Sequence, residues 1–150
     1  MKVLIIYHSE HHGNTKKIAK AMGEKINADV LNAADVDINI FKKYDICGFG
    51  SGVYNGKLHN ELSEILSRLS LKDNKKAFIF STTGSKAYSS MAHKRIRPTL
   101  EEKGFEIIGE FSCLGFDTAL TSEGINQGRP NTHDIGEAED FIKGIIKIIN

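Results

Sequence analysis

Short apolar runs alternate along this chain with segments of helical pattern. The clearest runs, at 3–6, 77–80 and 105–113, are rich in β-branched and aromatic residues, which is typical of strands buried on both faces of a sheet. Weaker runs at 29–31 and 44–50 predict two more strands. The pattern therefore predicts five strands in all.

The segments between these runs carry apolar residues at the spacing of an amphipathic helix. Apolar positions at i, i+3, i+4 and i+7 mark one face of helices near 14–26, 62–69 and 135–149. A further helix is expected over about 89–103, where Pro98 predicts a kink or a late start.

Because strands and helices alternate, the sheet is expected to be parallel and covered by helices on both faces. Right-handed crossovers leave two common arrangements for five such strands, of which we favour the order 2-1-3-4-5. The sequence thus predicts one domain over residues 1–150, an α/β/α sandwich of three layers around a five-stranded parallel sheet. Ligands in such sheets bind beyond the carboxyl ends of the strands, near the switch point between strands 1 and 3.

A small polar loop and a helix start follow the first strand, within residues 9–15. Unpaired backbone N–H groups and a partial positive charge at a helix N-terminus attract an anion. Gly13 lets the backbone approach a ligand closely, while Ser9, Asn14 and Thr15 offer side-chain donors. We favour a phosphate site here over a capped turn that binds nothing.

The same stretch resembles the phosphate loop of the flavodoxin family, through Tyr7-x-Ser9 followed by Gly13-Asn14-Thr15. The resemblance covers nearly the whole chain in length and element order. It implies the flavodoxin-like fold and FMN held without a covalent bond.

This loop departs from the family pattern by one residue. The family usually has two positions between the serine and the glycine, whereas here Glu10, His11 and His12 stand between them. We therefore expect the loop to bulge, which leaves open the backbone amides that would face a phosphate.

Two later loops fall where flavodoxins place their flavin contacts, after the third and fourth strands. In the first, Tyr54 precedes an Asn-Gly turn signal, and an aromatic or apolar side chain would cover a flavin ring. The second, residues 81–85, is rich in hydroxyls and glycine, whose N–H groups suit the polar edge of a heterocycle. The alternative for the first loop is a plain surface turn, and for the second it is a strand-to-helix loop rich in Ser and Thr that binds nothing. The candidate cofactor-binding residues are Ser9, Glu10, His11, His12, Gly13, Asn14, Thr15, Val53, Tyr54, Asn55, Gly56, Thr82, Thr83, Gly84, Ser85 and Tyr88.

Composition and charge argue against two classes of partner, nucleic acids and membranes. A net charge of +1 and the absence of a basic block argue against nucleic acid, and no apolar stretch is long enough to cross a membrane. We expect a cytoplasmic protein in which Cys47 and Cys113 are buried, reduced thiols. The histidines lack the spacing of a metal motif, so no metal site is expected.

The resemblance implies a carrier of electrons between redox partner proteins. A small FMN-dependent NAD(P)H reductase acting on quinones, metals or nitro compounds is the first alternative, weakened because no second nucleotide-binding motif is apparent. An interaction module without cofactor is the other. Residues 115–131 form a long polar stretch without periodicity, which would either edge the flavin or contact a partner.

Overall fold

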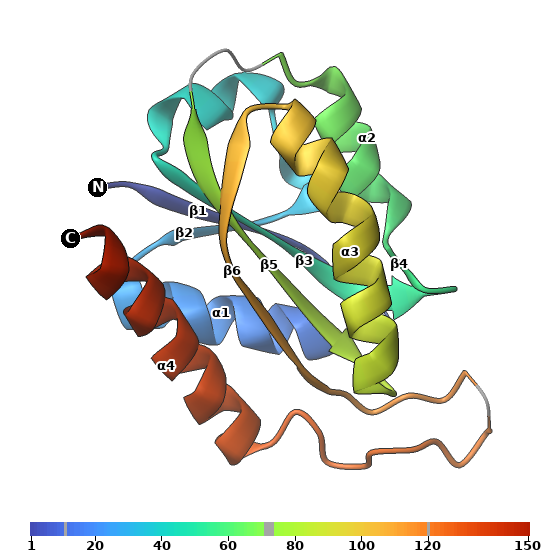
Figure 1. Ribbon diagram of the computed structural model, residues 1–150. Coiled ribbons are helices and arrows are strands. Elements are labelled where there is room, and N and C mark those ends of the chain that lie inside the picture. The colour runs from blue at the N-terminus through green and yellow to red at the C-terminus, as the bar shows by residue number, and fades with distance from the viewer. Residues whose placement is uncertain (11, 71–73, 120) are drawn as a thin grey trace.

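Five long parallel strands form the centre of the molecule, and a sixth, short strand pairs with one of them (Figure 1). The computed structural model describes residues 1–10, 12–70, 74–119 and 121–150. The strands are β1 (Val3–His8), β2 (Asp29–Asn32), β3 (Ile46–Tyr54), β4 (Lys57–Leu58), β5 (Lys75–Thr83) and β6 (Phe105–Leu114). The helices are α1 (Asn14–Ile26), α2 (Asn60–Arg68), α3 (Lys86–Glu102) and α4 (Thr132–Ile149), with the 3-10 helices η1 (Ala33–Asp35) and η2 (Ile38–Lys43).

The long strands lie in the order β2-β1-β3-β5-β6, which confirms the predicted order 2-1-3-4-5. Strand β4 was not predicted, because two residues carry no hydrophobic pattern. It pairs antiparallel with the end of β3 through Val53–Leu58 and Tyr54–Lys57. Consequently β3 continues four residues beyond its predicted end, to Tyr54.

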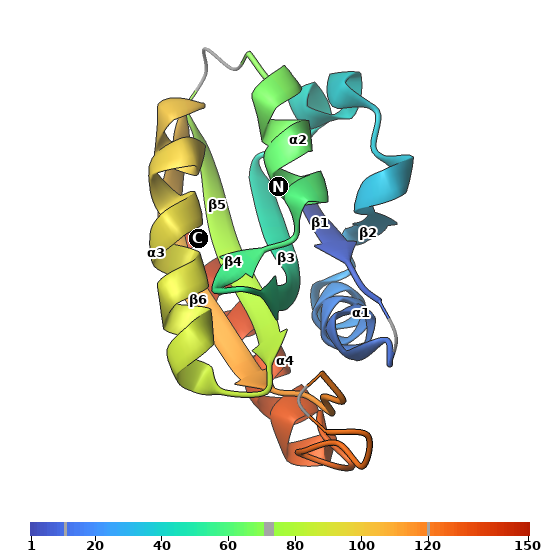
Figure 2. The same cartoon turned by 90° about the vertical axis from the view of Figure 1, so that its right-hand side faces the viewer.

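Helices cover both faces of the sheet (Figure 2). Helices α1 and α4 pack on one face, while α2 and α3 pack on the other. Side chains of β1 alternate between these two cores: Ile5 faces α1 and α4, whereas Leu4 and Ile6 face α2 and α3. Because both faces are buried, β1 is a continuous apolar run rather than an alternating one.

Glycines in β3 make room for aromatic rings of β5. A Cβ atom at Gly48 would lie 2.3 Å from Cζ of Phe78, and one at Gly50 would lie 2.3 Å from Cε2 of Phe80. Both rings are fully buried. The alternation of small and large residues in this strand therefore reflects close packing against its neighbour.

Helix α3 begins at Lys86 and continues through Pro98, so of the two predicted outcomes, a kink or a late start, the late start is wrong. A proline leaves the carbonyl four residues before it without a helical partner. That carbonyl belongs to Lys94, and both Lys94 and Pro98 are exposed. Water can therefore take the place of the missing N–H group.

Cys47 and Cys113 are buried and free, as predicted. Burial raises the pKa of each thiol to about 12. Both side chains therefore remain protonated and act as small apolar groups of the core.

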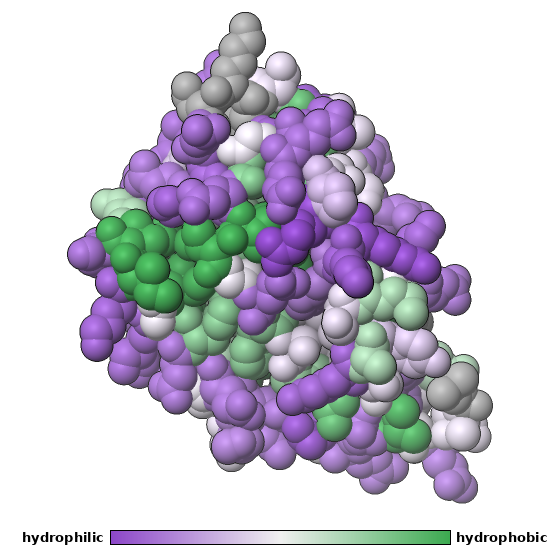
Figure 3. Space-filling model, viewed as in Figure 1, coloured by the Kyte–Doolittle hydropathy of each residue, from purple (hydrophilic) through white to green (hydrophobic). Residues whose placement is uncertain are grey.

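The visible face of the molecule is largely polar (Figure 3). An apolar area lies over the C-terminal end of α4, where Ile148 is 80% exposed. Within the described ranges, none of the helices is both long and apolar enough for a membrane span.

Candidate functional site

Two adjoining cavities open at the carboxyl ends of the strands: the first spans the switch point between β1 and β3, and the second lies beside the ends of β3 and β5. The first cavity has a volume of about 350 Å³ and the second about 460 Å³. They share Val53, Thr83, Gly84, Asp117 and Ala119 as lining residues, so they form one continuous site.

The predicted site residues divide between these cavities. The first cavity is lined by Ser9, Glu10, His12, Asn14, Thr15, Tyr54 and Thr82 in addition to the shared residues. The second is lined by Asn55, Gly56, Ser85 and Tyr88. Gly13 lines neither cavity, and His11 lies outside the described residues.

The start of helix α1 shapes one wall of the first cavity. Gly13 is the N-cap residue, with φ 68°, and it makes no side-chain cap. Its N–H group donates to the carbonyl of Glu10 at 3.3 Å, which closes the longer loop into a turn. Ser9 supplies a cap from outside the helix, since its Oγ accepts from the N–H group of Lys16 at 3.4 Å.

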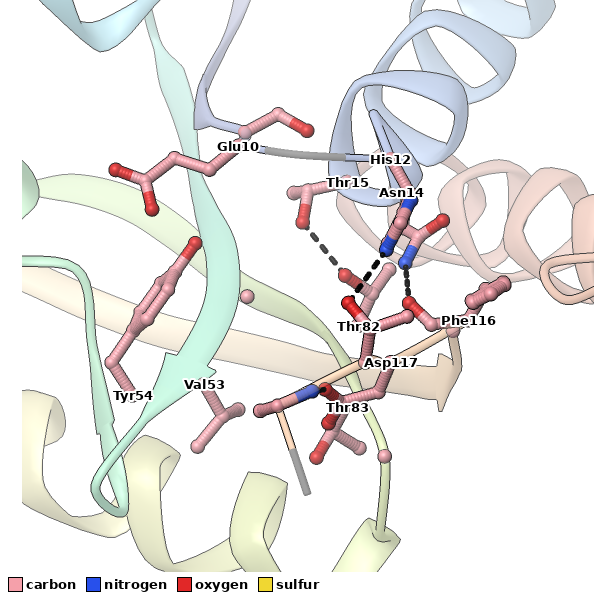
Figure 4. Close-up of a pocket in the computed structure, with 16 residues that line it drawn as sticks. Glu10, His12, Asn14, Thr15, Val53, Tyr54, Thr82, Thr83, Phe116 and Asp117 are labelled. Carbon is pink, nitrogen blue, oxygen red and sulfur yellow. Dashed lines mark hydrogen bonds between the residues drawn. The ribbon is translucent and has the colours of Figure 1, made fainter. Parts of the chain in front are cut away.

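Asn14 and Thr15 fasten this helix start to other parts of the site (Figure 4). Asn14 Nδ2 donates to the carbonyl of Phe116 at 2.9 Å, and the hydroxyls of Thr15 and Thr82 are 2.7 Å apart. Thr15 and Thr82 are buried. The first turn of α1 is thus held in a fixed position relative to β5 and to the segment after β6.

The hairpin between β3 and β4 forms a second wall. Asn55 and Gly56 have φ 51° and 73°, so the predicted Asn-Gly turn is present as a two-residue hairpin loop. Arg95 Nη1 donates to the carbonyl of Gly56 at 3.3 Å and to that of Asn55 at 3.4 Å. The turn is therefore braced from α3.

Tyr54 stands opposite the helix start, with its hydroxyl directed toward Glu10 (Figure 4). Burial is the main cause that raises the pKa of this phenol to about 12, and the nearby carboxylate of Glu10 adds to it. Tyr54 is consequently a neutral hydrogen-bond donor at the rim of the cavity.

Residues 115–119 close the site from a third side, a role that sequence reasoning had left open between edging a flavin and meeting a partner. Asp117 and Ile125 form an antiparallel bridge that folds the segment back on itself. Asn126 Nδ2 donates to the carbonyl of Gly84 at 3.0 Å and lies 3.4 Å from that of Gly115. No periodic pattern marks these residues, so sequence could not assign them.

The second cavity has an apolar wall at the surface. Tyr88 is 55% exposed, Met91 44% and Ile125 37%. Met91 and Ile125 were missed by sequence reasoning, because one lies on the outer face of a helix and the other in an irregular segment. Together the cavities present N–H and hydroxyl donors at one end and apolar surface at the other.

The chain is similar in sequence to a known protein family and to a known protein. The family model described as a flavodoxin domain matches residues 4–140. An uncharacterized protein of Methanocaldococcus jannaschii is 48% identical over 150 residues, which covers 98% of this chain and 99% of the relative.

Solved structures are similar in fold. A flavodoxin from the domain Archaea is 20% identical with a TM-score of 0.71, and flavodoxin 2 from Bacillus cereus is 20% identical with a TM-score of 0.73. Each comparison covers 99% of both chains. A Fusobacterium nucleatum flavodoxin described as bound to flavin mononucleotide is 12% identical with a TM-score of 0.70, again over 99% of both chains.

Proposed function

This chain belongs to the flavodoxin domain family, and we propose that it binds FMN without a covalent bond and carries electrons between redox partner proteins. The observation that carries the proposal is the two-part site. One end presents a helix N-terminus and hydroxyls, and the other presents apolar side chains. FMN has the same division into an anionic phosphate and a flat, largely apolar ring.

The phosphate is assigned to the first cavity, beside the start of α1. The helix N-terminus supplies N–H groups and a partial positive charge there, and no acidic residue lies in the first turn of α1. The hydrogen bonds of Asn14 and Thr15 to other segments fix this turn before any ligand arrives. A fixed set of donors loses little entropy on binding.

The flavin ring is assigned to the second cavity, between the Asn55-Gly56 turn and the start of α3. Tyr88 and Met91 offer aromatic and thioether surface to a planar ring, and Val53 lies at the junction with the first cavity. Bound FMN would supply the electron-carrying chemistry. The side chains described here would bind it, orient it and exclude water from one face.

The test is a visible absorption spectrum of the purified protein, followed by extraction and identification of its cofactor. We expect a flavin spectrum and release of FMN by denaturation, with negligible oxidation of NADH or NADPH by the protein alone. A colourless protein that does not take up added FMN would overturn the proposal. Steady turnover of either nucleotide with a quinone, at about 1 s⁻¹ or faster, would assign the protein as a reductase instead.

A further inference from the structure

Two histidines and two glutamates form a cluster beside the first cavity. His8 ends β1, Glu10 follows it, and His59 directly precedes α2. The imidazole rings of His8 and His59 stack with centroids 3.5 Å apart and planes inclined by 9°. Glu10 Oε1 lies 3.1 Å from His8 Nε2 and 3.4 Å from His59 Nε2. One ligand atom from each of the three side chains lies within 4.8 Å of the others.

His8 has one nitrogen satisfied and one that is not. Its Nδ1 forms a very short contact with the carboxylate of Glu61, to which an N–H group would donate. Its Nε2 is enclosed and makes no hydrogen bond to any residue within the described ranges, although Glu10 Oε1 is close. In a neutral imidazole that donates from Nδ1, Nε2 carries a lone pair. That lone pair faces a carboxylate oxygen, so a cation between the two atoms would stabilise the pair.

The distances match the spacing of two ligands of one metal ion. Nitrogen and oxygen ligands lie at about 2.0–2.2 Å from Zn²⁺, so neighbouring ligand atoms are separated by about 2.9–3.5 Å. The 3.1 Å contact between Glu10 Oε1 and His8 Nε2 falls in that range. His8 Nε2 makes no hydrogen bond within the described residues although the Glu10 oxygen is at this distance, so a proton does not already join the two atoms.

We propose that His8 Nε2 and Glu10 bind a divalent transition-metal ion, with His59 Nε2 as a third ligand. Zn²⁺ is the probe of this class, because imidazole and carboxylate together suit it. Glu61 is the outer carboxylate that orients His8, an arrangement common around metal-bound histidines. The sequence pattern did not predict the site because the ligands come from two segments about 50 residues apart.

His59 must move to join the ion. Its Nδ1 accepts from the N–H group of Glu61 at 3.1 Å, so in this position its Nε2 carries the hydrogen. In addition, the rings of His8 and His59 are stacked and nearly parallel. A nitrogen lone pair lies in the plane of its ring, so the lone pairs of two parallel rings cannot both point at one ion. Rotation of the His59 ring would correct both faults, at the loss of this N-cap hydrogen bond of α2.

The different positions of the ligands predict a ranking of variants. His8→Ala and Glu10→Gln remove the two ligands that need no rearrangement, so each should weaken Zn²⁺ binding most. Glu61→Gln should weaken it by roughly 10–100-fold, as is usual for an outer carboxylate. His59→Ala should have the smallest effect of the four. In the wild type, the binding energy from His59 as a ligand is offset by the loss of its N-cap hydrogen bond to α2.

The experiment is a calorimetric Zn²⁺ titration of the tag-free full chain, with and without added FMN, and a Co²⁺ titration followed by visible absorption. We expect one site per chain, and Co²⁺ bands that disappear in His8→Ala and Glu10→Gln. The matched control is His133→Ala, since His133 is an exposed histidine whose Nε2 lies 3.1 Å from Glu137, and this pair has no third ligand among the residues that the structure describes.

Two outcomes would overturn the proposal: the absence of one-to-one Zn²⁺ binding in the wild type, or binding that survives in both His8→Ala and Glu10→Gln. The Glu10 side chain is 40% exposed, so its replacement keeps the fold even if His8→Ala does not. The readout is independent of flavin binding, so failure of the FMN proposal leaves this test intact.

Discussion

The two ends of the site differ in how their side chains are held. At the first cavity, Asn14 and Thr15 make hydrogen bonds to residues that are 102 and 67 positions away in the sequence, respectively. At the second cavity, Tyr88, Met91 and Ile125 present partly exposed apolar surface. One end is built from directional contacts that are already formed, whereas the other is built from surface that gains contacts only when covered.

This difference has a physical consequence for recognition. Hydrogen-bond donors of fixed geometry distinguish a ligand that carries the matching acceptor from one that lacks it. Apolar surface is less selective, because burial of any flat apolar group of suitable size is favourable. We therefore expect selectivity to come from the first cavity and a general gain in affinity from the second.

The largest effect is expected when the phosphate is removed from the ligand. Riboflavin keeps the ring but loses the charge-assisted hydrogen bonds, each worth roughly 1.5–3 kcal/mol. Two such bonds correspond to a loss of ~10²–10⁴-fold in affinity relative to FMN. Fluorescence titration of the apoprotein with both ligands measures this ratio. Equal affinities would mean that the first cavity does not hold the phosphate.

A smaller effect is expected at the other end. Tyr88→Ala combined with Met91→Ala should weaken FMN and riboflavin equally, by about 2–3 kcal/mol, because both ligands share the ring. The control is Ile148→Ala, which removes an exposed apolar side chain from the far end of α4. A loss confined to FMN would contradict the assignment of the ring to this cavity.

Replacement of one glycine at each end tests how much space the backbone has there. Gly13 and Gly56 have φ 68° and 73°, so alanine at either position should destabilise the fold by about 1–2 kcal/mol. A Cβ at Gly13 has no neighbour within 4 Å among the described residues, whereas one at Gly56 would lie 2.7 Å from Met91 Sδ. Gly56→Ala should therefore cost more than Gly13→Ala in urea denaturation. The reverse ranking would show that the space beside Gly13 is filled.

The smallest effect concerns His93 of α3, which lies against Ser81 of β5. His93 is buried, and its Nε2 lies 2.7 Å from Ser81 Oγ. Burial is the main cause that lowers the pKa of His93, against the opposing influence of Glu110, and Arg97 lowers it further. The folded state therefore binds fewer protons than the unfolded state below pH about 6.5, and stability should fall as the pH drops through that region.

We expect this loss of stability to begin as the pH falls below about 7. It is measured by urea denaturation at several pH values. His93→Gln should reduce the slope on the acid side more than replacement of the exposed His133 by glutamine does. An identical slope in His93→Gln would assign the acid sensitivity to other groups.

Much of the fold could be predicted because its signals are local. Leu4, Ile5 and Ile6 form a run that is typical of a doubly buried strand, and alternation and handedness left two common strand orders, one of which is present. What could not be predicted depends on contacts between distant segments. Strand β4 depends on its pairing with the end of β3, and α3 tolerates Pro98 because that position faces solvent.

The candidate site divides in the same way. The loop of residues 9–15 could be predicted from its residue types at a strand-to-helix junction. Asp117 and Ile125 did not, because their place at the site depends on the way an irregular segment folds back. The cluster around His8 was also missed, since His59 and Glu61 reach it only through the return of the chain after β4.

The residues that line the two cavities are far apart in the sequence, so they are synthesised at different times. Lining residues of the two cavities run from residue 9 to residue 125, and the last wall follows β6. A chain that emerges from its N-terminus therefore presents the helix start long before the segment that closes the site. A ligand of both cavities can stabilise only the finished domain, by mass action on the native state. Cofactor loading thus comes after translation of nearly the whole chain, and a bound ligand reports that the domain has been completed.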